Sequence, residues 1–477
     1  MQKSILARAA ELACGVKFED LPPKLVDLAK TALIDYAGVC VAGSSEPSAK
    51  AALRYCLQNS VKKEASVFGS GETADAKYAA FANAVSAHAL DFDDVSWSTI
   101  GHPTCVIAPV CFALCEKLNL SGKKLILAYC AGVEVMHELA RLAMPSVSQN
   151  GWHTTSVFGI FGAAVAGAKL LGLDAKSLTP ALALAVSKAS GVRANFGSSA
   201  KHYHAGMAVL GGLDALELAL CGFSANEYAF EASESFLQIY GDVATNSQNF
   251  SGSNLTNDAE LRANLDRNKY LNYGLNFGKP WNLLQNGLVF KRYPSCSGSH
   301  PAIDLALDLR REHGIRAAEI KFVKIGCSLL APKELVCDVP ANATEAKFSM
   351  KFAVAAALYR GAAGLAEFLA ESVNDATIRD LMCKISVSVD EEFAALGFIG
   401  TSPAKIEIEL LSGEKIVGKN MLAKGNPQKP LGEAEFRDKF YSCTANLAQR
   451  ERLCELLSRI DELSNLSEVS EICKQTR

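Results

Sequence analysis

The sequence predicts a mainly α-helical protein, in which a large all-helical domain is interrupted by a smaller α+β lid domain. Three observations support this fold class. Apolar residues recur at helical spacing before residue 288, alternate with period two in several segments after it, and return to a charged helical pattern after residue 425. The 477-residue chain is also longer than one hydrophobic core usually becomes. We therefore predict a helical domain of residues 1–287 and 426–477, with residues 288–425 as the lid domain.

The N-terminal half consists of successive helix patterns. Residues 1–20 form an amphipathic pattern that Arg8 and Glu11 interrupt, which is unlike a signal peptide. Residues 22–43 begin with two prolines, which suit a helix start, and end at a glycine. Similar patterns cover residues 75–94, 121–144 and 177–191. The apolar run at residues 156–173 is rich in Gly and Ala and contains Lys169, so it predicts a closely packed helix and no membrane span.

Strand patterns begin after residue 288. Residues 320–330, 383–390 and 404–421 alternate apolar and polar side chains, and the last of them predicts a hairpin that turns at Ser412-Gly413. A helix pattern at residues 300–314 precedes the first of these strands, and another at 344–361 lies between the first two. The turn-rich stretch 424–432 then marks the boundary to the final helices.

Charge and cysteine usage narrow the class of protein. A net charge of −3 disfavours a nucleic-acid-binding protein, which usually carries a basic excess. The fifteen cysteines are odd in number and scattered through apolar runs, and none forms a CxxC pair. This pattern predicts reduced thiols in a cytoplasmic protein and no structural zinc site.

The segment 88–104 combines several carboxylates with a histidine. Asp91, Asp93 and Asp94 follow an apolar helix pattern, where carboxylates are costly unless they bind or cap something. Helix capping is the simpler interpretation for at least one of Asp93 and Asp94. His102 lies in a Gly-His-Pro turn that would fix its backbone.

Two further polar segments belong to the helical half. His153 directly precedes a helix of small residues, where the positive helix end favours a neutral imidazole and bound anions. The stretch 188–207 holds two cations that suit carboxylates, together with an amide and two histidines: Arg193, Lys201, Asn195, His202 and His204. Histidines two apart face the same way only on a strand, so a metal site there is disfavoured.

The segment 291–309 offers Tyr293, Cys296 and His300, the last directly before the proline that begins a helix. A simple loop leading into a core helix explains it equally well. The chain contains no GxGxxG, Walker A or GxSxG motif, so hydride transfer, phosphoryl transfer and serine-hydrolase chemistry lose support.

These polar segments together resemble the MmgE/PrpD family over about residues 5 to 445. The resemblance rests on five stretches in one order: HALDFDD with a following HP, WHTTSVFGIFGAAVAGAKLLGL, GVRANFG with KxxHAG, YPSCSGSH, and GNPQKPLGEAEFRDKF. It implies a helical domain with an inserted lid domain, usually as a homodimer. The family includes 2-methylcitrate dehydratases, cis-aconitate decarboxylases and iminodisuccinate epimerases, and the GVRANFG form looks more similar to the epimerase-like branch.

The resemblance also implies a small polycarboxylate substrate, no organic cofactor and no metal. By resemblance, Asp91, His102, His153, Lys201 and His300 match positions that line the family's active site. We expect Arg193, Asn195, Tyr293, Cys296 and His204 to contribute to substrate binding. One departure is His202-Tyr203, which replaces the family's usual small or apolar pair, so we look there for substrate preference.

The chemistry expected is proton removal from carbon next to a carboxylate. Histidine titrates near neutrality, so His102 or His153 would be base or acid, while Lys201 and Arg193 would anchor or neutralise a carboxylate. Asp91 would orient a histidine, and His300 on the lid would complete the site. We predict a cofactor-free, dehydratase-like lyase acting on a small di- or tricarboxylate. The alternatives are an epimerase of an amino- or imino-dicarboxylate, a non-catalytic carboxylate-binding protein, and, more remotely, a metallohydrolase.

Overall fold

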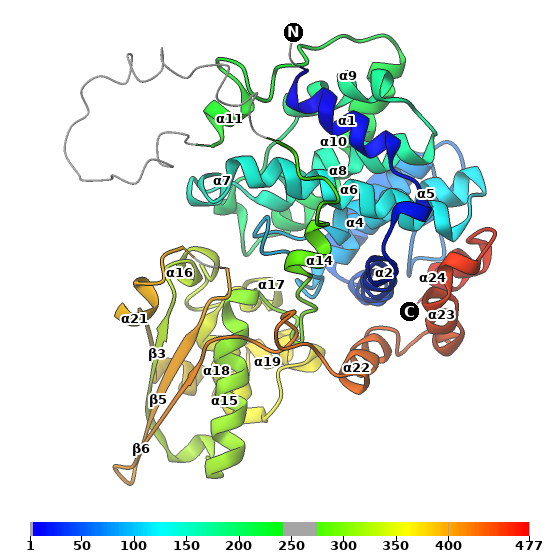
Figure 1. Cartoon of the computed structure of the whole chain (residues 1–477). Coiled ribbons are helices and arrows are strands. Elements are labelled where there is room, and N and C mark those ends of the chain that lie inside the picture. Colours follow the sequence, from blue (N-terminus) through cyan, green and yellow to red (C-terminus); the bar gives the residue numbers. More distant parts are fainter. Residues whose placement is uncertain (1–2, 242–273, 399, 477) are drawn as a thin grey trace.

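The computed structural model describes residues 3–241, 274–398 and 400–476. It is mainly α-helical, with a smaller α+β region, as the sequence predicts (Figure 1). We call residues 288–425 the α+β region and the remainder the helical region. The exact limits predicted for the two domains stay a prediction. None of the described helices combines the length and the apolar character that crossing a membrane requires.

The helical region is a bundle around one central helix, α8 (Thr154–Leu170), which packs against α5, α6, α9 and α10. Its longer helices before α14 are α1 (Ile5–Gly15), α2 (Pro23–Gly43), α3 (Pro47–Asn59), α4 (Ala76–Ala89), α5 (Thr104–Leu118), α6 (Gly122–Ala143), α9 (Ala175–Val186) and α10 (Ser199–Leu220). Short helices are α7 (Ser146–Gln149), α11 (Phe236–Ile239) and α14 (Asn282–Asn286), and two short strands, β1 (Ala65–Ser66) and β2 (Thr73–Ala74), pair antiparallel.

Glycines let the central helices approach closely. A Cβ added at Gly212 of α10 would lie 2.6 Å from the carbonyl oxygen of Ile160 on α8. On the opposite side, one added at Gly162 of α8 would lie 3.0 Å from the carbonyl oxygen of Gly132 on α6. The predicted close packing of the small-residue helix is therefore confirmed.

The C-terminal tail packs on the helical region. Its helices are α22 (Glu433–Cys443), α23 (Arg450–Ser458) and α24 (Ser467–Lys474), and Figure 1 shows them beside α2. Both α22 and α23 pack on α2. The first and last parts of the chain thus share one core, whose members include Leu33 and Leu457.

The α+β region is built on a four-stranded sheet in the order β4-β3-β5-β6. Its strands are β3 (Ile320–Cys327), β4 (Ile385–Val389), β5 (Ala404–Leu410) and β6 (Lys415–Asn420). The predicted hairpin is present, because Ile408 of β5 pairs with Ile416 of β6 across the turn at Gly413. β4 joins β3 in parallel, and β5 joins it antiparallel.

The longer helices that contribute to a separate apolar core with this sheet are α15 (His300–His313), α18 (Met350–Arg360) and α20 (Ala376–Cys383). The shorter helices are α16 (Ala331–Glu334), α17 (Ala343–Ala346), α19 (Ala370–Val373) and α21 (Glu391–Ala394). The helix predicted over 344–361 is broken between α17 and α18. At the break, Lys347 turns to the helical region, where its Nζ donates to Glu46 at 2.9 Å and to the carbonyl of Ala89 at 3.0 Å.

The two regions meet at the end of α4. Lys291 of the α+β region donates from Nζ to the carbonyl oxygen of Asp91 at 2.7 Å. Val95 and Val289 form a short antiparallel bridge beside it. Contacts from both regions therefore hold the turn after α4, where the sequence concentrates its carboxylates.

Candidate active site

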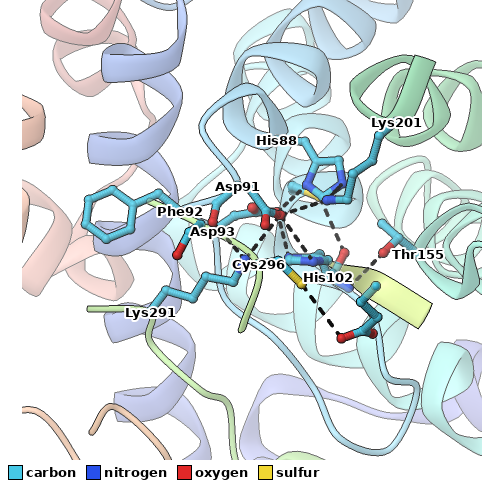
Figure 2. A network of polar contacts seen from close by, with 12 residues as sticks. His88, Asp91, Phe92, Asp93, His102, Thr155, Lys201, Lys291 and Cys296 are labelled. Atoms are coloured by element: carbon cyan, nitrogen blue, oxygen red, sulfur yellow. Dashed lines mark hydrogen bonds and ion pairs between the residues drawn. The ribbon is translucent and has the colours of Figure 1, made fainter. Parts of the chain in front are cut away.

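The site begins where α4 ends and the chain turns toward α5. Asp91 adopts a φ of 49°, in the left-handed region that non-glycine residues rarely occupy. Such a conformation costs energy and persists where surrounding contacts determine it. Here the turn directs the carboxylates of Asp91 and Asp93 toward His102, which lies just before α5 (Figure 2).

Asp91 is shared by two lysines. Its Oδ1 accepts from Lys201 Nζ at 2.7 Å and lies 3.1 Å from Lys291 Nζ, and all three side chains are buried. Burial alone would raise the pKa of the Asp91 carboxyl, but the two ammonium groups hold it well below its usual range. Two ammonium groups therefore lie beside this one carboxylate, whereas the second carboxylate of the cluster, Asp93, contacts the histidines.

Asp93 lies between two imidazoles. Its Oδ2 is 2.8 Å from His88 Nδ1 and 3.1 Å from His102 Nδ1. The other nitrogen of His88 lies 2.8 Å from Lys201 Nζ, so His88 connects the lysine to Asp93. Burial lowers the pKa of His88 to about 3 and lowers that of His102, while Asp93 opposes both shifts. Both rings are therefore neutral at neutral pH.

His153 directly precedes α8, as predicted, and lies beside His204. The Nδ1 atoms of the two rings are 3.0 Å apart, so one donates to the other. His153 Nε2 is buried without a hydrogen-bond partner among the described residues. Burial holds the pKa of His153 well below its usual range, so this nitrogen is available to a ligand.

A small cavity of about 30 Å³ connects these groups. The sequence-predicted residues that line it are Asp91, His102, His153, Lys201 and Cys296. The rest of its lining is Val95, Trp97, Ile100, Phe196, Lys291, Ser297 and Glu334. Lys291, Cys296, Ser297 and Glu334 come from the α+β region, so the two regions enclose the cavity together.

The other predicted site residues lie outside this lining. Asn195 is exposed, and Arg193 donates weakly to Ser148 Oγ at 3.4 Å. Tyr293 donates its hydroxyl proton to Asp304 at 2.6 Å, and its ring contacts His300. His300 Nε2 is 3.1 Å from the carbonyl oxygen of Ser295, while its buried Nδ1 has no partner among the described residues.

The pair His202-Tyr203 also lies away from the cavity. His202 is buried and bonds through Nδ1 to Ser48 Oγ at 2.9 Å, whereas the Tyr203 side chain is exposed. His204 turns instead toward His153. The two histidines of α10 therefore diverge, as expected on a helix, and do not form a shared metal site.

Four other groups come close enough to hold a metal ion: His88, Asp91, Asp93 and His102 offer ligand atoms within 4.8 Å of one another. The charges around them do not fit a cation. Lys201 contacts both Asp91 and His88 at hydrogen-bond distance, and Lys291 is 3.1 Å from Asp91. A metal ion bound there would have to displace or face two ammonium groups.

Asp94 contacts the start of α5, next to the site. It accepts from the backbone N–H of Thr104 at the start of α5 and forms a very short contact with the Thr104 hydroxyl, which also bonds to Tyr129 at 2.7 Å. Burial raises the pKa of Asp94 to about 8. Of the two aspartates considered as caps, Asp94 is the one that binds a helix start.

Sequence reasoning missed His88, Lys291 and Glu334. His88 is a lone histidine within an apolar helix, and Lys291 interrupts the apolar run LVFKRY. His88 and Lys291 are polar side chains at positions where the pattern predicts burial. That mismatch is the signal that could have found them. Glu334 follows Ala-Pro-Lys in a short helix and carries no such signal.

Comparison with known proteins agrees with this geometry. Residues 7–249 match the MmgE/PrpD N-terminal domain, and residues 293–462 match the MmgE/PrpD C-terminal domain. The chain belongs to the MmgE/PrpD family. The predicted family resemblance is thereby confirmed, whereas its leaning toward the epimerase-like branch stays a prediction.

Curated relatives extend along almost the whole chain. The cis-aconitate decarboxylases of Mus musculus and Homo sapiens are each 26% identical to it, cover 98% of it, and are themselves covered to 93% and 94%. The cis-aconitate decarboxylase of Aspergillus terreus is 22% identical, with 98% of this chain and 95% of the relative covered. Together with the family match, these relatives confirm the prediction of an MmgE/PrpD enzyme of the lyase type.

Proposed function

We propose that the chain is a lyase that acts on a small di- or tricarboxylate, without metal or organic cofactor, through a carbanion formed next to a carboxylate. The observation that carries this proposal is the buried arrangement of Lys201 and Lys291 around Asp91, beside two neutral histidines that line the cavity. The names of the curated relatives make cis-aconitate the first substrate to test.

The lysines supply the electrostatic part of the reaction. Loss of a proton or of carbon dioxide from such a substrate leaves negative charge, which spreads onto the neighbouring carboxylate oxygens. Fixed cations in a dry site stabilise this charge without reorganising during the reaction. Lys201 is fixed by Asp91 and His88, and it also lies over the rings of Phe196 and Phe348, at 5.3 and 5.4 Å from their centroids.

The histidines supply the proton transfer. His102 Nδ1 lies 3.1 Å from Asp93 Oδ2, and its Nε2 lies 3.7 Å from Asp91 Oδ1. When Nε2 takes a proton, these two carboxylates stabilise the imidazolium that forms. His153 presents an unpartnered Nε2 from another wall of the cavity. We assign these two residues as the base and acid pair and Asp91 as the group that orients Lys201.

The test follows cis-aconitate and related di- and tricarboxylates by proton NMR in D₂O, using purified protein. We expect formation of an alkene product with deuterium from solvent. Replacement of His102 or His153 by glutamine should lower turnover by about 10²–10⁴-fold. His137→Gln is the matched control, because His137 is also buried but lies on α6 outside the cavity lining.

The outcomes separate the alternatives. Solvent exchange without an alkene product would identify an epimerase, and binding without exchange or product would identify a carboxylate-binding protein. Full activity in both His102→Gln and His153→Gln would overturn the assigned roles. A cytoplasmic location and a homodimer remain part of the proposal, and light scattering of the purified protein tests the homodimer.

A further inference from the structure

Glu334 is the second acid of the cavity lining, and it is placed unlike Asp91. It ends the short helix α16 of the α+β region and reaches the same cavity as Lys201 and Lys291. Among the described residues, the one hydrogen bond to its carboxylate is weak and is donated by the Cys296 thiol to Oε2 across 3.7 Å. Within the described part of the chain, no Lys, Arg or His nitrogen lies within 4.0 Å of its carboxylate oxygens.

The surroundings of Glu334 fix the direction of its carboxylate. A Cβ added at Gly298 would lie 3.3 Å from Oε2, so the glycine leaves space for this oxygen. Cys296 donates its thiol to the same oxygen, and its own backbone N–H bonds to the carbonyl of Lys347 at 2.9 Å. The loop before α15 thus holds a carboxylate against the cavity and gives it only a thiol as donor.

The cavity therefore has two unequal sides. Lys201 and Lys291 form a cationic side that suits substrate carboxylates. Glu334 forms an acceptor side, which would repel a carboxylate and which lacks a strong donor of its own. Glu334 is half-buried at the cavity wall, and a ligand that brings a donor to this acceptor gains a hydrogen bond to an ionised group.

We propose that Glu334 contacts the substrate and selects one that carries an O–H or N–H group beside its carboxylates. This inference rests on the proposed function, since it assumes that a carboxylate substrate occupies this cavity. The O–H or N–H group donates to Glu334 while the carboxylates face the two lysines. Glu334 is then a specificity-determining residue contributed by the α+β region.

The experiment compares ligands that differ by a single hydroxyl. Malate with succinate, and citrate with tricarballylate, are such pairs, and isothermal titration calorimetry measures their binding without requiring turnover. We expect the wild-type protein at pH 8 to bind each hydroxy acid about tenfold more tightly than its partner, as a hydrogen bond to an ionised group allows. Glu334→Gln should reduce that preference to about threefold or less. Glu371→Gln, at an exposed acid of the same region, should leave it unchanged.

A second measurement on the wild-type protein guards against a variant that fails to fold. Burial raises the pKa of Glu334 to about 7; the charges of Arg193 and Lys291 oppose this rise and that of Asp91 adds to it. The carboxylate therefore becomes a stronger acceptor between pH 6 and pH 8. We expect the hydroxy-acid preference to increase over that range. The inference is overturned if the wild-type protein shows no preference for the hydroxy acids. It is also overturned if lowering the pH to 6 makes the protein prefer the ligands without a hydroxyl.

The result also separates this inference from the proposed function. Selective binding without turnover of any tested substrate contradicts the lyase but supports the role of Glu334. Turnover of cis-aconitate with equal binding of both members of each pair supports the lyase and contradicts that role. If none of the four acids binds, the role of Glu334 fails, whereas the lyase is still decided by turnover of cis-aconitate.

Discussion

Lys201 and Lys291 share one carboxylate, and this sharing decides what the loss of either should do. Removing Lys201 leaves Asp91 with Lys291 at 3.1 Å, so the fold keeps a paired buried carboxylate. The cavity, however, loses the cation that touches both Asp91 and His88. We therefore expect Lys201→Met to lower turnover by about 10²–10³-fold with little change in the circular dichroism spectrum.

Lys169 provides the matched control for this variant. It is half-buried, and its Nζ donates to three backbone carbonyls at or just after the end of α1, those of Ala13, Cys14 and Val16. Lys169→Met should lower the melting temperature and leave turnover per folded molecule unchanged. Turnover of Lys201→Met above half that of the wild type would show that this lysine does not stabilise the reaction.

The sequence could identify polar groups at turns but not those placed by distant contacts. His102 and His153 stand beside a turn and a helix start, so local pattern predicts their special position. Lys291 acquires its role only when the α+β region brings it to the Asp91 turn, 200 residues earlier in the chain. Tyr293 donates its hydroxyl proton to Asp304, a partner that no local pattern indicates, and its contact with substrate stays a prediction.

At the level of elements, the glycines of the central bundle should be intolerant of even a methyl group. At Gly212 an added Cβ would lie 2.6 Å from the Ile160 carbonyl oxygen and 2.9 Å from the Ala164 nitrogen, both of them backbone atoms that cannot rotate away. Gly212→Ala should therefore reduce the free energy of unfolding by about 1–3 kcal/mol, measured with urea. Gly15→Ala, with no atom within 4 Å of the added Cβ, is the control. Equal stability of the two variants would mean that α8 and α10 are packed less closely.

Elements were the level at which the sequence was most informative. The period-two pattern located the hairpin of β5 and β6, and the prolines and glycine located both ends of α2. The break between α17 and α18 was missed, although Ser349 caps the start of α18; Lys347 at the break also contacts Glu46, 301 residues away. No local pattern records such a contact.

For the whole molecule, buried histidines predict a marked loss of stability in acid. Burial lowers the pKa of each of the following: His88, His102, His137, His153, His202, His204 and His300. In the unfolded chain these rings titrate near pH 6.5, so the unfolded state binds more protons below that pH. The free energy of unfolding should therefore fall as the pH drops below about 6.5, by up to about 1.4 kcal/mol per pH unit for each histidine.

Buried carboxyls act in the opposite direction at higher pH. Burial raises the pKa of Asp94 to about 8 and those of Glu134 and Glu231 to about 7, so these groups hold protons that the unfolded chain has lost. Stability should then decline between about pH 6.5 and 8, which gives a maximum near pH 6.5 in urea titrations. His137→Gln should reduce the acid slope by about one proton. A stability that stays flat from pH 7 to pH 5 would contradict neutral burial of these rings.

Access to the cavity is the remaining property of the whole molecule. A space of about 30 Å³ holds roughly two water molecules, so a tricarboxylate enters only if the helical and α+β regions separate.

A designed disulfide tests this separation. Gly197 precedes α10, and a Cβ added there would lie 2.8 Å from the Sγ of Cys337 in the α+β region, which suits a disulfide. The Gly197→Cys variant should therefore lock the two regions when oxidised, and turnover should fall at least about tenfold and return with reductant. Gly197→Ala carries the same backbone strain, from a φ of +82°, without the thiol. If mass spectrometry shows the disulfide and turnover is undiminished, the regions do not need to separate.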